Sequence, residues 1–414
     1  MPRTLDWLIR HADVFDGTVW LGRPSVGILG EIVVMDPPAA RRGPVTRVID
    51  ATGKTLLPGL IDGHTHAFPA DMGQCMAFGV TTQIDMFNDP KLVRSLKRAA
   101  ERSPQVADLR SATIGVTCPG GHPTGLSGVF GSFPTLTERD DPTAFVDARI
   151  AEGADFLKVF VDSGTLVGQD LPRLEGRRLA AVVEAAHARG LAVVAHATTA
   201  GCAADAVRAG VDGLAHVFVD VPAGDGLLAE LRAAGVFVTT TVAALAALAG
   251  TPVGRHLTGD ERVRRHVPPG RLRRLAAARP DGDRAAVPLD RILATVRRLH
   301  QAGIRIIAGT DAPNAGTTAG AGLHLEIDLL VAAGLPVEAA LAAATSVPAA
   351  AFGLRDRGRI ADGARADLVL VDGSVTGSPR STLAVDTVWR GGRRFDSEAY
   401  RGAMARLFPD GGQP

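Results

Sequence analysis

The sequence predicts an α/β protein in which a (β/α)₈ TIM barrel carries a small β-sandwich domain built from both ends of the chain. Between residues 55 and 352, apolar strand-like runs alternate with amphipathic helical stretches, as in βα units around a parallel sheet. Eight such runs occur, over a length that is usual for this kind of barrel. Both chain ends instead show short strands separated by turns, and all three tryptophans lie in these ends.

The predicted small domain has two separate parts. A chain of 414 residues suits one large domain and a smaller one. Residues 1–54 contain the strand-like runs "DWLIRHADVFDG", "VGILGEIVVMD" and "TRVIDATG", and residues 353–414 contain "GRIADGARADLVLVDG" and "VDTVWRGGRRF". We expect these two segments to meet and to leave residues 55–352 as the barrel.

The eight predicted barrel strands end in polar or glycine-rich tips. In order they are "TLLPGLIDGHTH", "VTTQIDMF", "LRSATIGVTCPGG", "DFLKVFVDSG", "LAVVAHATT", "DGLAHVFVD", "VFVTTTVAAL" and "RIIAGTDAP". Helices are predicted between them, for example over 175–189, 202–209 and 225–234. An insertion rich in Arg, Gly and Pro follows strand seven, over 250–284. Its arginines could form a lid that recruits a carboxylate, but we favour a solvated charged face.

Composition and charge exclude several classes of protein. The formal net charge is +1, so the composition gives no indication of a basic surface that binds nucleic acid. No stretch reaches the ~18 consecutive apolar residues of a membrane span, and the N-terminus lacks the apolar core of a signal peptide. The three cysteines form no CxxC pair, so a disulfide framework is not expected. We expect a cytoplasmic homo-oligomer that acts on a small-molecule substrate, without a nucleic-acid or membrane partner.

Polar side chains at the strand tips are the candidate functional groups, because barrel sites gather at the C-terminal ends of the strands. His64 and His66 should point the same way from strand one, since side chains alternate along a strand. This pair alone could be a metal half-site or two polar residues at a strand end. The later tips add Lys158, His196, His216 and Asp311, from strands four, five, six and eight. Four imidazoles and a carboxylate converging on one point suit zinc or a similar metal.

Lys158 is the most informative of these residues. It is one of four lysines, and the other three lie in loops or polar helical contexts. In "DFLKVFV", Leu157 and Val159 should face the outer helices, whereas Phe156, Lys158 and Phe160 should face into the barrel. Burial would lower the pKa of the amine and leave it neutral and nucleophilic. Such an amine can add carbon dioxide and become a carbamate, which is able to bridge two metals.

This ordered set resembles the metal-dependent amidohydrolase superfamily, over nearly the whole chain. The features are HxH in "GLIDGHTH", a strand-four lysine, single histidines on strands five and six, and "GTDAP" at strand eight. "GVTT", "CPGGH", "AHATTAGCAADAVRAGVDGLAHV" and "GLHLEIDLLVAAGLPVEAALAAATSVPAAAFGL" resemble the branch that contains imidazolonepropionase-like enzymes and Xaa-Pro dipeptidases. The lysine favours the dipeptidase side, since the resemblance implies that imidazolonepropionases and most deaminases hold one metal without it.

The resemblance implies a role for each candidate ligand. His64, His66 and Asp311 would hold the more buried metal, His196 and His216 the more exposed one, and carboxylated Lys158 and a hydroxide would bridge them. The implied cofactors are two divalent ions, with zinc expected first and manganese or iron as alternatives, and carbon dioxide as the carbamate. The hydroxide would attack a carbonyl, and Asp311 would pass its proton to the leaving nitrogen. The expected reaction is hydrolysis of an amide or cyclic amide C–N bond in a dipeptide, an N-acyl amino acid or a lactam-like ring.

Two further histidines are candidates. His122, in "CPGGHPTG", lies in the loop after strand three, where it could bind the substrate carbonyl or stabilise the oxyanion. The alternative is a loop histidine shaped by its Gly and Pro neighbours, and we favour the functional interpretation. His324, in "AGAGLHLEID", would either bind substrate after strand eight or be an ordinary residue near a helix N-terminus.

Other activities remain open from sequence. A mononuclear deaminase of this superfamily would carry a Glu close to the strand-five histidine, but Ala197, Thr198 and Thr199 follow His196. A lactonase would need the same parts as an amide hydrolase. A non-hydrolytic cyclase, lyase or decarboxylase, or a catalytically silent scaffold, could share the fold, because function depends on the site and not on the barrel.

Overall fold

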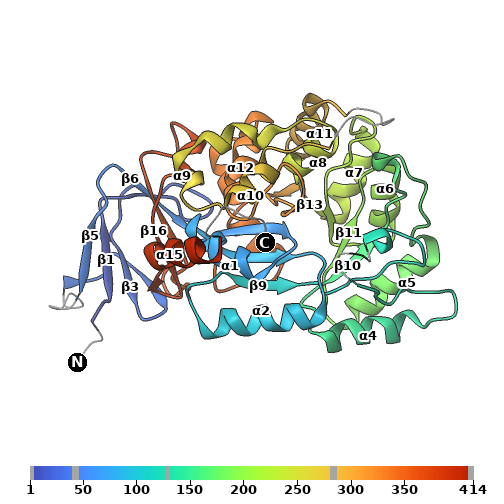
Figure 1. Ribbon diagram of the computed structural model, residues 1–414, viewed down its shortest axis with the longest axis horizontal. Helices are drawn as coiled ribbons and strands as arrows, with labels where there is room; N and C mark the ends of the chain where they lie inside the picture. The colour runs from blue at the N-terminus through green and yellow to red at the C-terminus, as the bar shows by residue number, and fades with distance from the viewer. Residues whose placement is uncertain (1–3, 40–45, 127, 129–130, 280–286, 409–414) are drawn as a thin grey trace.

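A computed structural model describes residues 4–39, 46–126, 128, 131–279 and 287–408, with parallel strands at its centre (Figure 1). One parallel sheet has the order β7-β8-β9 and a second has the order β10-β11-β12-β13-β14. The first contains β7 (Leu60–Thr65), β8 (Val80–Asp85) and β9 (Asp108–Ser111). The second contains β10 (Leu157–Phe160), β11 (Val193–His196), β12 (Gly213–Ala215), β13 (Phe237–Thr239) and β14 (Arg305–Ile307).

Seven of these strands lie within the predicted runs, and β9 begins one residue before its run, at Asp108. Neighbouring strands within both sheets pair in parallel. Isolated parallel bridges join Val116 to Val159 and Thr65 to Ala312, so backbone contacts connect the sheets on both sides. The parallel α/β fold predicted from the sequence is therefore confirmed.

Helices follow the strands and cover them. They are α1 (Pro69–Ala77), α2 (Pro90–Arg102), α4 (Pro142–Glu152), α5 (Gly176–His187), α6 (Ala200–Arg208), α7 (Asp225–Ala234), α8 (Val242–Leu248), α11 (Leu289–Gln301), α12 (Ala321–Ala332), α13 (Val337–Ala342) and α14 (Ser346–Ala351). Local sequence determines several ends: the Asp89 and Asp141 side chains accept backbone N–H groups at the starts of α2 and α4, each followed by proline. The helices predicted over 175–189, 202–209 and 225–234 correspond to α5, α6 and α7.

The two faces of β10 are buried in different surroundings. Leu157 and Val159 belong to the large hydrophobic cluster that contains helix residues such as Leu179. Phe156 packs in another cluster, formed largely by residues of other strands such as Ile84. The predicted division of this strand into a helix-facing and an inward-facing side is confirmed, and Lys158 is on the inward side with 1% of its surface exposed.

The two chain ends form two further sheets at one end of the molecule (Figure 1). One, of order β4-β3-β1-β5, contains β1 (Trp7–Arg10), β3 (Val26–Leu29), β4 (Ile32–Met35) and β5 (Arg47–Asp50). The other, of order β17-β16-β15-β6-β2, contains β2 (Asp13–Val14), β6 (Lys54–Pro58), β15 (Leu368–Asp372), β16 (Val385–Arg390) and β17 (Arg393–Arg394). Residues from near both termini therefore share one sheet.

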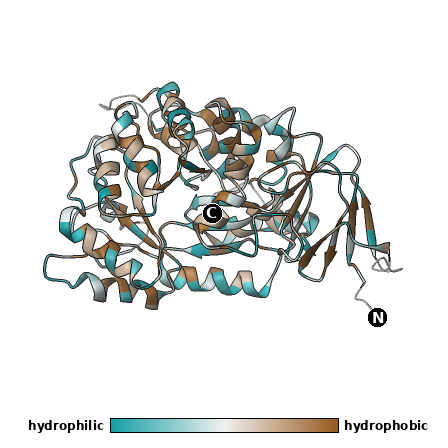
Figure 2. Cartoon of the chain, turned by 180° about the vertical axis from the view of Figure 1, so that it is seen from behind, coloured by the Kyte–Doolittle hydropathy of each residue, from teal (hydrophilic) through white to brown (hydrophobic). Residues whose placement is uncertain are grey.

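A single hydrophobic cluster lies between these two sheets, and Figure 2 shows their strands as mostly hydrophobic. Trp7 of the first sheet meets Trp389 of the second edge to face, with ring centroids 5.7 Å apart. Strand β6 pairs with β15 along its whole length, so residues 55–58 lie in this sheet although the sequence assigned them to the barrel. The two chain ends therefore meet as expected, and residues 55–58 join them in the same sheet.

The insertion after the seventh parallel strand packs on the body of the protein. Within 250–279 it forms η4 (Val253–Gly259), α9 (Glu261–Arg264) and α10 (Pro269–Leu275), while residues 280–284 of the predicted insertion lie outside the described ones. Arg271 is buried and forms an ion pair with Asp71 of α1, 2.6 Å between Nη1 and Oδ1. The C-terminal helix α15 (Ser397–Leu407) adds a hydrogen bond from the Tyr400 hydroxyl to the His266 carbonyl. The expectation of a wholly solvated face is wrong for Arg271, because an acidic partner on α1 receives it.

Among the residues with described positions, every helix is too short or too polar to cross a membrane.

Candidate metal centre

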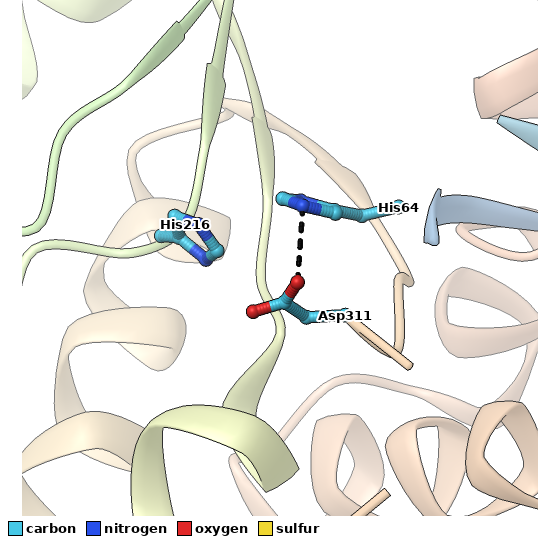
Figure 3. Close-up of side chains that lie close together, drawn as sticks. All are labelled: His64, His216 and Asp311. Carbon is cyan, nitrogen blue, oxygen red and sulfur yellow. Dashed lines mark ion pairs between the residues drawn. The ribbon is translucent and has the colours of Figure 1, made fainter. Parts of the chain in front are cut away.

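The predicted polar side chains come together where the parallel strands end. His64 lies in β7 and His66 just after it, Lys158 lies in β10, His196 ends β11, and His216 and Asp311 follow β12 and β14. Figure 3 shows His64, His216 and Asp311 pointing toward one another. One potential ligand atom from each lies within 4.8 Å of the others, and all three residues are buried.

Asp311 connects the two histidines of the HxH motif. Its Oδ1 lies 3.3 Å from His64 Nε2 and 3.1 Å from His66 Nε2. The ring of His216 lies beside that of His64, tilted by 41°, with centroids 4.7 Å apart. One carboxylate and three imidazoles therefore surround a single point, and this donor set suits zinc or another divalent transition metal.

His196 extends the cluster on its other side. Its Nδ1 lies 3.1 Å from His216 Nε2, so these two nitrogens face each other. Lys158 is near enough that its charge acts on the pKa values of His64, His196 and His216. All six candidate ligands from the sequence are thus neighbours in the structure.

Outer partners orient the imidazole rings. His66 Nδ1 lies 3.0 Å from the Phe87 carbonyl oxygen, and His216 Nδ1 lies 2.6 Å from Thr241 Oγ1. The Phe87 carbonyl can only accept, so His66 Nδ1 is the donor, and the Nε2 atoms of both rings face other members of the cluster. Metal-binding histidines commonly have such an outer partner on the nitrogen that does not bind the metal. His64 Nδ1 is buried without a hydrogen-bond partner in the described part of the chain, so the polar groups present do not fully satisfy this ring. The residues therefore fit a bound metal.

Burial controls the charges of the cluster. It lowers the pKa of His64 to about 4 and holds the pKa values of His196 and His216 well below their usual range, so these rings are neutral at pH 7. Burial would raise the pKa of Asp311, but His64, His66 and His216 hold it well below its usual range. Burial would also lower the pKa of His66, but Asp311 and Asp85 raise it above its usual value. The three neutral imidazoles and the ionised carboxylate have the protonation states that metal binding needs.

Lys158 has the properties expected from its position in the strand. Burial lowers the pKa of its amine to about 7, against the opposing effects of Asp311 and Asp85. Its Nζ lies 5.8 Å from the centroid of the Phe160 ring. At neutral pH a large share of this amine is therefore uncharged and nucleophilic.

His122 joins the cluster, whereas His324 does not. The ring of His122 stacks on His196 with centroids 4.5 Å apart, and burial lowers the pKa of His122 to about 4. His324 is buried in α12, where its Nδ1 lies 2.9 Å from Thr382 Oγ1 and its Nε2 lies 2.9 Å from the Phe78 carbonyl oxygen. Because both nitrogens are occupied, the contacts of His324 support a structural role and not the substrate-binding role suggested from sequence.

Two buried aspartates that the sequence analysis passed over hold the ligand-bearing backbone. Asp62 accepts hydrogen bonds from the Thr310 amide, the Thr310 hydroxyl and the His64 amide, and burial raises its pKa to about 7. Asp85 accepts from the Ser111 hydroxyl at 2.5 Å and from the Ala67 amide. The sequence did contain an indication of these residues, since an aspartate lies within each of the predicted strand segments "GLID" and "TTQID".

The cluster also has unusual backbone conformations. Six non-glycine residues in the described ranges have positive φ, and three of them belong to or contact this cluster: His216 (146°), Thr241 (47°) and Asp311 (54°). Such conformations cost about 1–3 kcal/mol each and persist where surrounding contacts enforce them. Around Asp311 those contacts include the hydrogen bond from its amide to the His64 carbonyl oxygen.

Comparisons with known proteins agree with this arrangement. A sequence model of the amidohydrolase family matches residues 55–394. No curated protein sequence matches the chain. Among solved structures, a Xaa-Pro dipeptidase with methionine bound in its active site is 24% identical, with a TM-score of 0.75, over 94% of this chain and 100% of that chain.

Two further structures cover nearly the whole chain. A prolidase complexed with N-methylphosphonate-L-proline is 22% identical, with a TM-score of 0.70, over 94% of this chain and 99% of that chain. Phenylurea hydrolase B is 21% identical, with a TM-score of 0.73, over 95% of this chain and 97% of that chain. At these identities the structural matches establish a common fold.

Proposed function

Because the chain belongs to the amidohydrolase family and is a hydrolase acting on C–N bonds, we propose that its histidine cluster is a binuclear metal centre that cleaves an amide or cyclic amide. The substrate classes we propose are dipeptides, N-acyl amino acids and lactam-like rings. The observation that supports this most is the cluster of His64, His216 and the ionised Asp311, which His66 and His196 extend and the buried Lys158 amine influences electrostatically.

We propose that the eight parallel strands close into a (β/α)₈ barrel and that the two end sheets form a β-sandwich. The bridges between Val116 and Val159 and between Thr65 and Ala312 support closure of the barrel. The hydrophobic cluster shared by the end sheets supports the sandwich. In this arrangement all six ligands would lie on one rim.

In the proposed centre, each ion has its own ligands. His64, His66 and Asp311 would hold one ion, His196 and His216 the other, and Lys158 both. For its part, the neutral Lys158 amine would form an N–C bond to carbon dioxide and lose a proton, giving a carbamate anion. When bound, two divalent ions, with zinc expected first, would acidify water and polarise the scissile carbonyl.

Asp311 is the proposed proton shuttle. Its carboxylate is ionised because the neighbouring imidazoles hold its pKa well below the usual range, although burial opposes this. In this ionised form it would accept the proton of the attacking water and deliver it to the leaving nitrogen. Its Oδ1 lies 3.3 and 3.1 Å from the Nε2 atoms of His64 and His66, the two side chains that would hold an ion together with it.

His122 is the proposed donor to the substrate. Since its pKa is about 4, the ring is neutral at pH 7 and can donate one N–H hydrogen bond to the carbonyl oxygen as negative charge develops there. Phe160 lies beside it and is the first of three phenylalanines in successive contact, since Phe160 contacts Phe87 and Phe87 contacts Phe133. These rings favour a substrate with an apolar group near the scissile bond.

A substrate screen tests this function. The protein loaded with zinc or manganese would be offered dipeptides, N-acyl amino acids, lactams and lactones, and the products would be identified by mass spectrometry. We expect water to be added across a C–N bond, with the fastest turnover for apolar substrates. Turnover of lactones alone, or release of ammonia with one metal bound, would contradict the proposal.

A further inference from the structure

The loop after β13 reaches the metal centre through one hydroxyl group. Thr241 Oγ1 lies 2.6 Å from His216 Nδ1, and both residues are buried. This contact orients the His216 ring so that its Nε2 lies 3.1 Å from His196 Nδ1. The position of Thr241 therefore helps to determine the direction in which the Nε2 atom of His216 points.

Thr241 occupies an unusual place for a threonine. It is the residue immediately before α8, where a threonine ordinarily uses its hydroxyl to accept a backbone N–H of its own helix. Here the side chain makes no such cap, and the backbone is left-handed with φ 47°. The hydroxyl is thus available to His216 only if another group caps α8 and maintains this backbone conformation.

Glu326 of α12 supplies both functions. Its Oε1 accepts the Thr240 hydroxyl at 2.5 Å and the Val242 amide at 2.8 Å, and its Oε2 accepts the Ala243 amide at 3.2 Å. These contacts lie on both sides of Thr241 and replace the missing cap. The carboxyl group is fully buried, so it is a fixed part of the interior.

We propose that Glu326 is a positioning residue for the metal centre, acting through Thr241 to orient His216 as a ligand. This inference rests on the proposed function, since it assigns His216 to a bound ion. Glu326 itself contacts neither substrate nor metal ligand. Its effect is expected on the affinity of the ion that His196 and His216 hold.

The test compares zinc affinity among single-hydroxyl variants, by competition with a chromophoric chelator. Thr241→Val keeps the β-branched shape and removes the contact to His216, so affinity should fall about 10- to 100-fold, as for other outer-shell partners. Thr241→Ser retains the hydroxyl and should restore most of the affinity. Thr239→Val is the matched control, because the Thr239 hydroxyl is buried without a hydrogen-bond partner in the described ranges.

A double variant tests the route from Glu326. Glu326→Gln replaces one acceptor oxygen with an amide group, and it should weaken zinc binding less than Thr241→Val does. If Glu326 acts through Thr241, combining the two changes should weaken binding no more than Thr241→Val alone. The absorption bands of the cobalt-substituted protein should change in Thr241→Val and Glu326→Gln and remain unchanged in Thr239→Val.

Several results would overturn the inference. Wild-type zinc affinity in Thr241→Val would show that the hydroxyl orients nothing, and full additivity in the double variant would separate Glu326 from Thr241. Melting temperatures identify variants that fail to fold. If Thr241→Val is one of them, the zinc affinities of Thr241→Ser and Glu326→Gln, compared with the wild type, test the inference. If the wild-type protein binds no zinc, the proposed function fails together with this inference. If the wild type binds zinc and Thr241→Val binds it equally well, only this inference fails.

Discussion

At the scale of single residues, Lys158 should show the strongest effect. Its amine is buried in β10 of the second parallel sheet, and Lys158→Ala removes the group that would join both ions. We expect a loss of metal and activity larger than the ~10- to 100-fold typical of outer-shell partners. Short carboxylic acids, such as acetate and propionate, should restore part of the activity by supplying the two missing oxygens. Activity and bound metal are measured together.

The exposed Lys91 provides a control for this prediction. Lys91→Ala removes a lysine from the start of α2 and should behave like the wild type. Normal turnover of Lys158→Ala would show that no bridge exists at this position.

His122 should affect the chemical step. If its neutral ring donates to the developing oxyanion, His122→Ala should lower kcat about 100- to 1,000-fold, as for other oxyanion donors. His122→Asn keeps a donor and should recover part of the loss. Steady-state kinetics on the best substrate from the screen provide the measurement. An unchanged kcat in His122→Ala would show that His122 has a structural role in its loop and no role in the chemical step.

The sequence could reveal the candidate ligands but not their supports. Each ligand interrupts or ends an apolar run, and strand alternation brings such residues to one edge. Glu326 and His324 lie in "GLHLEIDLL", a helix buried over most of its surface, whose pattern does not distinguish its faces. Their partners, Thr240 and Thr382, are far away in sequence. Only the folded chain therefore shows that Glu326 supports the loop after β13 and that His324, a predicted substrate-binding residue, has structural contacts.

At the scale of elements, the insertion helix α10 depends on one buried arginine. Arg271 pairs with Asp71 and also donates to the Gln74 side chain, 2.8 Å from Nη1 to Oε1. Arg271→Met leaves the Asp71 carboxylate buried without its partner, and we expect the free energy of unfolding to fall by about 3–5 kcal/mol. Denaturant unfolding of the metal-free protein measures this loss.

The neighbouring Arg273 is exposed, and Arg273→Met is the matched control. It should change the free energy of unfolding by less than about 1 kcal/mol, as surface substitutions usually do. Equal losses in the two variants would contradict the role of the buried pair.

Elements could be predicted better than their contacts. All eight parallel strands and α5 to α7 follow from runs and periodicity in the sequence. The contact of α10 with α1 could not be predicted in this way. A cluster of arginines is expected to be exposed to solvent unless the position of Asp71 is known. Local pattern determines which segments form, whereas pairing of distant charges requires the fold.

At the scale of the whole molecule, Asp108 at the start of β9 joins the parallel sheet to the C-terminal part of the chain. It pairs with Arg357 at 2.5 Å and contacts Arg365 and Arg390. Burial would raise the pKa of Asp108, but Arg357, Arg110 and Arg390 hold it below its usual range. Asp108→Asn leaves their charges without this partner, and we expect a loss of about 3–5 kcal/mol in the free energy of unfolding at pH 7.

The loss should depend on pH in a defined direction. The folded carboxylate binds its proton less readily than the unfolded one, so its contribution is present above pH ~4 and disappears as the pH falls below that value. Unfolding curves at pH 7 and pH 3 should therefore show the difference between wild type and Asp108→Asn shrinking at the lower pH. A constant difference would contradict the charge-based explanation. Asp13→Asn, in an exposed pair with Arg23, is the control and should cost under about 1 kcal/mol.

The meeting of the chain ends could be predicted from composition, since strands and tryptophans occur at both ends. The exact extent of the shared sheet could not, because β6 reads as part of the first barrel run. Only its pairing with β15 shows that Lys54–Pro58 belongs to the end sheets.

The number of zinc ions bound per chain tests the central claim most directly. Metal analysis of the purified, zinc-equilibrated protein by inductively coupled plasma mass spectrometry should give two equivalents for the wild type and fewer for Lys158→Ala. One equivalent in the wild type, unchanged by loss of the lysine, would contradict the binuclear centre, and none would contradict a metal site altogether.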